Sequence, residues 1–169
     1  MTTHAPGGPA SPPASVIATA AAAAPAIVRG MGPEDSQLLV EQAKLVGEYL
    51  KNQGLTTSQI RNVFGTVRSI ESTWRLAGRA GGDAAEATRT RTRALHDLNL
   101  LKPRMAYAAS RSPVVRHLAD VLTPAIDAVL ADPAPPAGAD RADPALQRFG
   151  NFLDFFEAIL AYHRAAGGR

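Results

Sequence analysis

Apolar side chains recur at helical spacing through most of this chain, and this periodicity limits its fold more than any other feature. Residues three and four apart share one face of a helix, whereas a strand requires strict alternation. The clearest stretch is the last one, which holds Leu146, Phe149, Phe152, Leu153, Phe156, Ile159 and Leu160. No stretch alternates convincingly, so the sequence predicts an all-α fold, a compact bundle of five to six helices.

The N-terminal residues differ in composition from the rest. Positions 1–33 are rich in proline and alanine and hold Arg29 as their only formal charge. Such a segment buries too little apolar surface to offset the cost of ordering it. We therefore predict a disordered tail over 1–33 and a single helical-bundle domain over 34–166. Cysteine is absent, no run is long enough to cross a membrane, and the alanine run lacks the basic flank of a signal peptide, so we expect a cytoplasmic protein.

Glycine and proline predict the helix boundaries. The first helix is expected to start at Pro33 and to end before Gly54, and the second is expected to be capped by Thr56 or Thr57. Pro103 is expected to separate two helices, because the residue before a proline avoids helical angles.

Two further breaks in the helical pattern are expected beyond Pro103. Pro124 either kinks its helix or begins a new one. Prolines between 131 and 144 predict a loop. The closing helix is apolar over more than half of its circumference, so we expect it to pack centrally.

Positive charge is concentrated in the middle of the chain. Between positions 56 and 116 stand eleven Lys and Arg against four Asp and Glu, a net charge of +7, whereas the remaining residues sum to −4. A basic middle between acidic flanks indicates a polyanionic partner on one face, although arginine-rich and alanine-rich chains are also common without one.

Three arginines on the second predicted helix repeat at intervals of seven. Arg61, Arg68 and Arg75 drift by only about 20° at each step and therefore line one edge. Gly65 lies on nearly the same face, where a mid-helix glycine costs about 1 kcal/mol relative to alanine. A phosphate or a crossing helix would explain the glycine, and a solvated charged edge remains the alternative.

A second basic group surrounds Pro103. Arg104, Tyr107 and Arg111 stand at i, i+3 and i+7, so they share a helix face. Lys102 precedes the expected helix start, where free N–H groups favour an anion. Two arginines beside a tyrosine suit phosphates and a sugar or base, unless Tyr107 is simply half-buried.

Enzyme signatures are not found in the sequence. It has no glycine-rich phosphate loop and no HExxH motif, and the acidic pair Glu34-Asp35 reads as a helix start. His96, His117 and His163 would form an acid–base group only if the fold gathered them, and His163 is expected to cap its helix end. We therefore expect no catalysis, no metal and no cofactor.

Three motifs in order resemble the small subunit of type III-A CRISPR (Csm) complexes. They are LTTSQIRNVF at 55–64, LLKPRMAY at 100–107 and FGNFLDFFEAILAYH at 149–163. The family pattern has a Thr-Ser-Gln-x-Arg helix start, a Leu-Lys-Pro-Lys/Arg-x-Ala-Tyr segment and a Phe-rich helix that ends in Ala-Tyr-His-Lys. The resemblance spans about 37–165, and Arg164 stands where the family has lysine.

The resemblance implies a non-catalytic helical subunit that binds RNA in antiviral defence. It implies several copies stacked in an inner filament, beside the backbone subunits and the large subunit, where target RNA pairs with CRISPR RNA. By family position, the RNA-binding residues would be Arg61, Arg68, Lys102 and Arg104, followed by Arg75 and Arg111, whereas Tyr107 and Tyr162 would support packing. The alternative is an unrelated helical accessory or regulatory protein that binds nucleic acid.

Overall fold

Six helices make up the described part of the chain. The computed structural model describes residues 13–30, 32–77, 84–131 and 143–168. Its helices are α1 (Pro13–Arg29), α2 (Pro33–Asn52), α3 (Thr57–Ala77), α4 (Ala84–Arg111), α5 (Val114–Leu130) and α6 (Pro144–Ala165). No strand occurs in these stretches. The predicted all-α bundle is confirmed.

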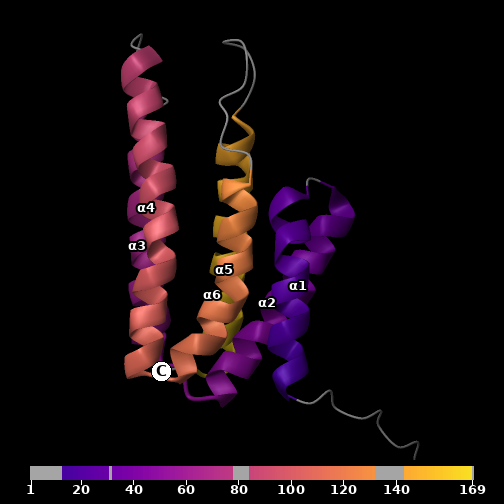
Figure 1. Cartoon of the computed structure of the whole chain (residues 1–169). Coiled ribbons are helices and arrows are strands. Elements are labelled where there is room, and N and C mark those ends of the chain that lie inside the picture. The colour runs from indigo at the N-terminus through magenta and orange to yellow at the C-terminus, as the bar shows by residue number, and fades with distance from the viewer. Residues whose placement is uncertain (1–12, 31, 78–83, 132–142, 169) are drawn as a thin grey trace, which may run out of the picture.

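The helices form two layers of three (Figure 1). One layer holds α4, α5 and α1 in that order, and the other holds α3, α6 and α2. Across the layers α4 packs on α3, α5 on α6 and α1 on α2. The α3–α4 pair therefore forms one edge of the molecule and the α1–α2 pair the opposite edge.

The predicted N-terminal tail is wrong for residues 13–29, which form helix α1. The buried face of α1 packs on α5, α2 and α6 and consists of Ile17, Ala20, Ala24, Ile27 and Val28. Pro13 stands at the helix start, where its missing N–H costs nothing, and only Pro25 is interior. Alanine is the best helix former, so the composition supports a helix once a surface is available to pack against. Positions 1–12 and 31 lie outside the described residues.

The predicted boundary at Pro103 is also wrong, because α4 continues through it. A proline removes one helical hydrogen bond and crowds the preceding turn. On α4, however, Leu98, Leu101, Met105 and Ala109 are buried on both sides of Pro103, and Pro103 itself is exposed. Core packing on either side therefore holds the helix together across the lost bond. Helix α5 likewise runs through Pro124. The expected loop at 131–144 lies mostly outside the described residues, and α6 already begins at Pro144.

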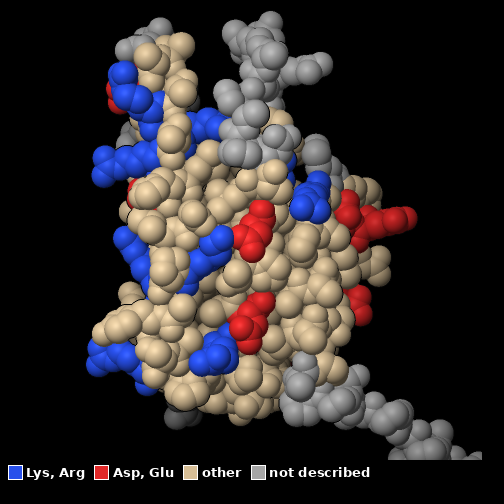
Figure 2. Space-filling model, viewed as in Figure 1, with Lys and Arg blue, Asp and Glu red and all other residues tan. Residues whose placement is uncertain are grey.

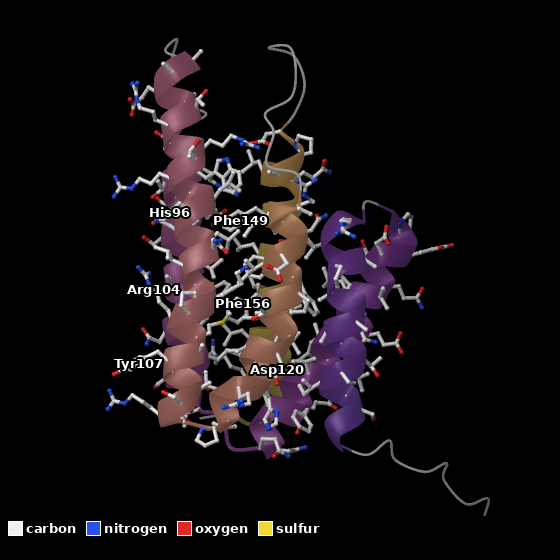
Figure 3. The ribbon with its side chains drawn as sticks, viewed as in Figure 1. His96, Arg104, Tyr107, Asp120, Phe149 and Phe156 are labelled. Atoms are coloured by element: carbon white, nitrogen blue, oxygen red, sulfur yellow. The ribbon has the colours of Figure 1, made fainter. Side chains whose placement is uncertain are left out.

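Helix α6 is central, as predicted. Its four buried phenylalanines are Phe149, Phe152, Phe155 and Phe156, each at most 1% exposed. The Phe149 ring lies 5.2 Å from that of Trp74, and the Phe156 ring lies 5.2 Å edge-on from that of Phe64. Figure 3 shows Phe149 and Phe156 in the interior, between the α3–α4 pair and the central helices. These contacts fasten α3 to the core and fix the orientation of its outer face.

The α2–α3 turn is held by α6. Gly54 adopts a left-handed φ of 85° just after α2, as expected for a helix-ending glycine. The next residue, Leu55, accepts a hydrogen bond of 2.7 Å through its carbonyl from the Nε2–H of His163, a fully buried side chain. His163 therefore bonds to the turn before α3, whereas the sequence analysis expected it to cap the end of its own helix. It links the end of α6 to the beginning of α3.

Candidate nucleic-acid interface

A reciprocal cap fixes the start of α3. The Oγ1 of Thr56 accepts a hydrogen bond from the N–H of Gln59 (3.2 Å), and the Oε1 of Gln59 accepts one from the N–H of Thr56 (2.9 Å). From this cap the helix buries Ile60, Val67, Ile70 and Trp74 and leaves Arg61, Arg68 and Arg75 exposed. The predicted arginine edge therefore faces away from the core.

Glu71 binds two of these three arginines. Nη1 of Arg68 lies 2.7 Å from one carboxylate oxygen of Glu71, and Nη2 of Arg75 lies 2.7 Å from the other. The Glu71 side chain is only 12% exposed, whereas both arginines stay more than half exposed. Glu71 thus offsets part of their positive charge and holds both guanidinium groups in place.

More carboxylates lie near this part of α3. Burial raises the pKa of Asp154 on α6 above its ordinary range, and the negative charges of Glu157 and Glu71 raise it further. Both glutamates therefore lie near enough to Asp154 to disfavour its charged form. The half of α3 that begins at Glu71 is therefore less favourable to a phosphate than the half that precedes it.

Lys102 is also paired within the chain. Its Nζ lies 2.6 Å from Oδ1 of Asp127 on α5. Because α4 is continuous, Lys102 stands in the middle of a helix, and the predicted anion site at a helix start is wrong. A phosphate would have to compete with Asp127 for this lysine.

The remaining three residues that we predicted to bind RNA make no contact with a carboxylate in the described stretches. Arg61, Arg104 and Arg111 are exposed, and within the described stretches the structure gives none of them an ion-pair or hydrogen-bond partner. Figure 3 shows Arg104 pointing outward from α4, away from the central helices.

The antiparallel pairing of α3 and α4 brings two acid-free segments together. Residues 57–70 and 98–111 contain no Asp or Glu. A hydrogen bond of 3.0 Å from Nε2 of Gln59 to Oγ of Ser112 sets the start of α3 beside the end of α4. Figure 2 shows the result, with Lys and Arg gathered over the α3–α4 edge and most Asp and Glu elsewhere. We call Arg61, Arg104, Tyr107 and Arg111 the cationic face.

Tyr107 stands in the middle of the cationic face and is 66% exposed. Figure 3 shows it projecting from α4 on the same side as Arg104. The expectation that Tyr107 supports packing is wrong, because its i+3 position relative to Arg104 puts it on the outer face. Tyr162, in contrast, is half-buried against the core, as expected.

A shallow pocket borders the cationic face between α3 and α4. Its walls are Asn62, Val63 and Thr66 from α3 and Leu101, Arg104, Met105 and Ala108 from α4. Gly65 is one helical turn from Arg61, and a Cβ built on it meets nothing within 4 Å. The described part of the chain therefore supplies no crossing helix at Gly65, and this surface is open.

The histidines have three different surroundings. The ring of His117 packs edge-on against Tyr49 at 5.3 Å, His163 bonds to the α2–α3 turn, and His96 is exposed on α4 (Figure 3). Among the described residues, no group of three or more His, Asp or Glu is placed to hold a metal ion.

One basic residue has a structural role that the sequence reasoning missed. Nε and Nη2 of Arg91 on α4 lie 2.6 and 3.0 Å from the two carboxylate oxygens of Asp143. Asp143 also accepts a hydrogen bond from the Ala145 N–H and so caps α6. The aspartate before Pro144 could have indicated the cap, but nothing in the sequence links it to a residue 52 positions earlier.

Two neighbouring helices with an outward cationic face, packed on an aromatic core, place this chain among small all-helical proteins with a basic outer edge. The family model described as Csm2 Type III-A matches residues 33–169, and the chain belongs to this family. It is the small subunit of a type III-A CRISPR Csm complex, and the family is a structural one. The alternative of an unrelated helical accessory protein is thereby excluded.

The other comparisons add no relative. Neither the curated proteins nor the solved structures contain a match to this chain. Helix α1 lies before the matched residues, so it is an addition to the part that the family model covers. None of the helices in the described stretches has the length and hydropathy needed to span a membrane.

Proposed function

We propose that this subunit binds RNA without cleaving it, through phosphate contacts made by the cationic face. In the Csm complex it would form the inner filament that holds target RNA paired to CRISPR RNA, in the cytoplasm, as part of antiviral defence. Its neighbours would be other copies of itself, the backbone subunits and the large subunit. The observation that carries this proposal is the joining of two acid-free segments at one exposed edge.

Arginine on a rigid helix suits this task. The guanidinium group stays charged, is weakly hydrated and donates two parallel hydrogen bonds to a phosphate. Base pairing between guide and target reads the sequence, so the protein has to supply only contacts that are the same for every sequence. Helices α3 and α4 hold the arginines because their apolar sides are fixed in the core.

The ion pairs rank the six candidate residues. Arg61, Arg104 and Arg111 can meet a phosphate without breaking a contact in the described structure, so we assign them first. Arg68, Arg75 and Lys102 would first have to give up or share a carboxylate. We assign them a secondary contribution.

Salt dependence of binding tests this proposal. Each phosphate contact that is lost should lower the slope of log affinity against log salt by about 0.7 to 0.9 units. We expect Arg61→Ala with Arg104→Ala to lower the magnitude of the slope by about 1.4 to 1.8 units for each copy of the subunit that contacts the RNA, and to weaken binding equally for two unrelated guide–target pairs. The measurement is target capture by the assembled complex across a salt series.

Matched controls separate this effect from general charge loss. Lys44 is exposed on α2, outside the cationic face, so Lys44→Ala should leave the slope almost unchanged. Arg68→Ala with Arg75→Ala should change the slope less than the Arg61 and Arg104 pair. A wild-type slope in the Arg61 and Arg104 variant, or loss of only one of the two targets, would contradict the proposal.

A further inference from the structure

Tyr107 is the exception among the aromatic residues of this chain. The sequence has nine Phe, Tyr and Trp residues, and all nine lie in described stretches. Eight of them are buried or half-buried in the bundle, and only Tyr107 is exposed, at 66%. An aromatic ring that the core does not use, at the centre of a charged surface, requires an explanation outside the bundle.

The neighbours of Tyr107 suit a nucleotide. Arg104 and Arg111 lie one helical turn before and after it, where side chains on a helix surface are about 5–6 Å apart at Cβ. Neither arginine has a partner within the described residues. On the side facing α3, the pocket beside Arg104 and Ala108 presents the amide of Asn62 and the hydroxyl of Thr66.

We infer that Tyr107 stacks on an unpaired RNA base, with Arg104 and Arg111 on the adjacent phosphates. This inference rests on the proposed function and adds to it, because it names a contact of the cationic face with a base that is not paired between guide and target. Inside a duplex the flat faces of the bases are covered by their neighbours, so a projecting ring gains little there. An unpaired base offers its face to the ring, and every base has such a face, so the contact tolerates any sequence.

Fluorescence of a base analogue tests the inference in the full chain. The probe is a short single-stranded RNA with one 2-aminopurine, whose emission falls when it stacks on an aromatic ring. We expect quenching by the wild type and by Tyr107→Phe, which keeps the ring. Tyr107→Ala should abolish the quenching and weaken single-strand binding by roughly 5- to 150-fold, the range for one lost stacking contact.

The same RNA annealed to its complement provides the comparison. Duplex affinity should change less than about twofold in Tyr107→Ala, because its arginines remain. Val40 is also exposed, at 48%, but on α2, so Val40→Ala is a matched control that should bind both probes like the wild type. Because Tyr107 is on the surface, the melting temperature of Tyr107→Ala should stay within about 2 °C of the wild type.

The failures of the two proposals can be told apart. Wild-type single-strand binding and quenching in Tyr107→Ala would overturn the stacking inference alone, as would equal losses for single strand and duplex. Unchanged RNA binding with loss of co-purified subunits would make Tyr107 a protein contact and also overturn it. If the wild type bound neither RNA, nor captured target in the assembled complex, the proposed function would fail and the stacking inference with it.

Discussion

Gly47 and Gly65 are both mid-helix glycines, but their surroundings are opposite. A Cβ built on Gly47 would lie 2.7 Å from the backbone N of His163 and 2.8 Å from the carbonyl O of Ile159, both on α6. A Cβ on Gly65 meets nothing within 4 Å. Gly47 therefore allows α2 and α6 to approach closely, whereas Gly65 only lowers the helix propensity of α3.

The two alanine substitutions should change stability in opposite directions. We expect Gly65→Ala to raise the free energy of unfolding by up to about 1 kcal/mol, because alanine is the better helix former. Gly47→Ala should lower it by about 1–3 kcal/mol, since the new methyl group meets backbone atoms that have no rotamer to adopt. Thermal denaturation of both variants measures this, and shifts of the same sign would contradict the assigned roles.

Among the helices, α1 is the one whose contribution to the stability of the bundle is least evident from its amino-acid composition. Its buried face belongs to the same hydrophobic core as the other helices, and Asn151 on α6 donates hydrogen bonds to the carbonyls of Val28 (2.9 Å) and Gly30 (2.7 Å) at its end. Burial of each large aliphatic side chain stabilises a fold by about 1.5–3 kcal/mol. With three such side chains, α1 is an integral part of the bundle.

Two alanines of α1 make a matched test. Ala24 is fully buried and Ala22 is exposed on the same helix. We expect Ala24→Asp to lower the melting temperature by at least about 5 °C, because a carboxylate placed in the core has no partner there. Ala22→Asp should shift it by no more than about 2 °C. Equal shifts would mean that α1 does not pack on the bundle in solution.

At the scale of the whole molecule, the Arg91–Asp143 pair joins the α3–α4 edge to the central helices. Both side chains are largely buried, at 13% and 17% exposed, unlike the exposed ion pairs elsewhere on α4. Burial by itself raises the pKa of Asp143, but the hydrogen bond from Arg91 and those from the backbone outweigh it, so that the net pKa is lowered. The folded state therefore holds the charged form of Asp143.

Because the pKa of Asp143 is lowered in the folded state, the stability that this carboxylate adds to the fold should be lost in acid. A carboxyl whose pKa is lower in the folded state stabilises that state fully at every pH above its pKa in the unfolded chain, about 3.9. This stabilisation disappears as the pH falls through the lower pKa of the folded state. We expect Asp143→Asn, which still caps α6, to be less stable than the wild type at pH 7. The difference in melting temperature should shrink below about pH 4.

Asp127→Asn is the control for this experiment. Asp127 pairs with Lys102 but is 56% exposed, and surface pairs contribute little. Its melting temperature should remain close to that of the wild type from pH 7 down to pH 4. Parallel melting curves for Asp143→Asn and the wild type across the whole pH range would show that the Arg91 pair does not stabilise the fold.

Local patterns in the sequence determined much of this protein. Helical periodicity predicted the bundle and the central place of α6. Capping and turn residues predicted a cap at Thr56 or Thr57 and the helix end at Gly54, because these depend on residues within a few positions of one another. The ordered motifs predicted the family. The outward direction of Arg61, Arg68 and Arg75 followed from their seven-residue spacing.

Tertiary structure decided what depends on partners distant in the sequence. The sequence predicted disorder for residues 13–29 and a helix boundary at Pro103. Packing against other helices outweighs the entropy cost of ordering 13–29 and the loss of a helical hydrogen bond at Pro103. The family resemblance placed Arg68 and Lys102 ahead of Arg111, but in the structure Glu71 pairs with Arg68 and Arg75, and Asp127 pairs with Lys102. The other three of the six basic residues remain uncommitted, because the antiparallel contact of α3 and α4 places their acid-free segments side by side.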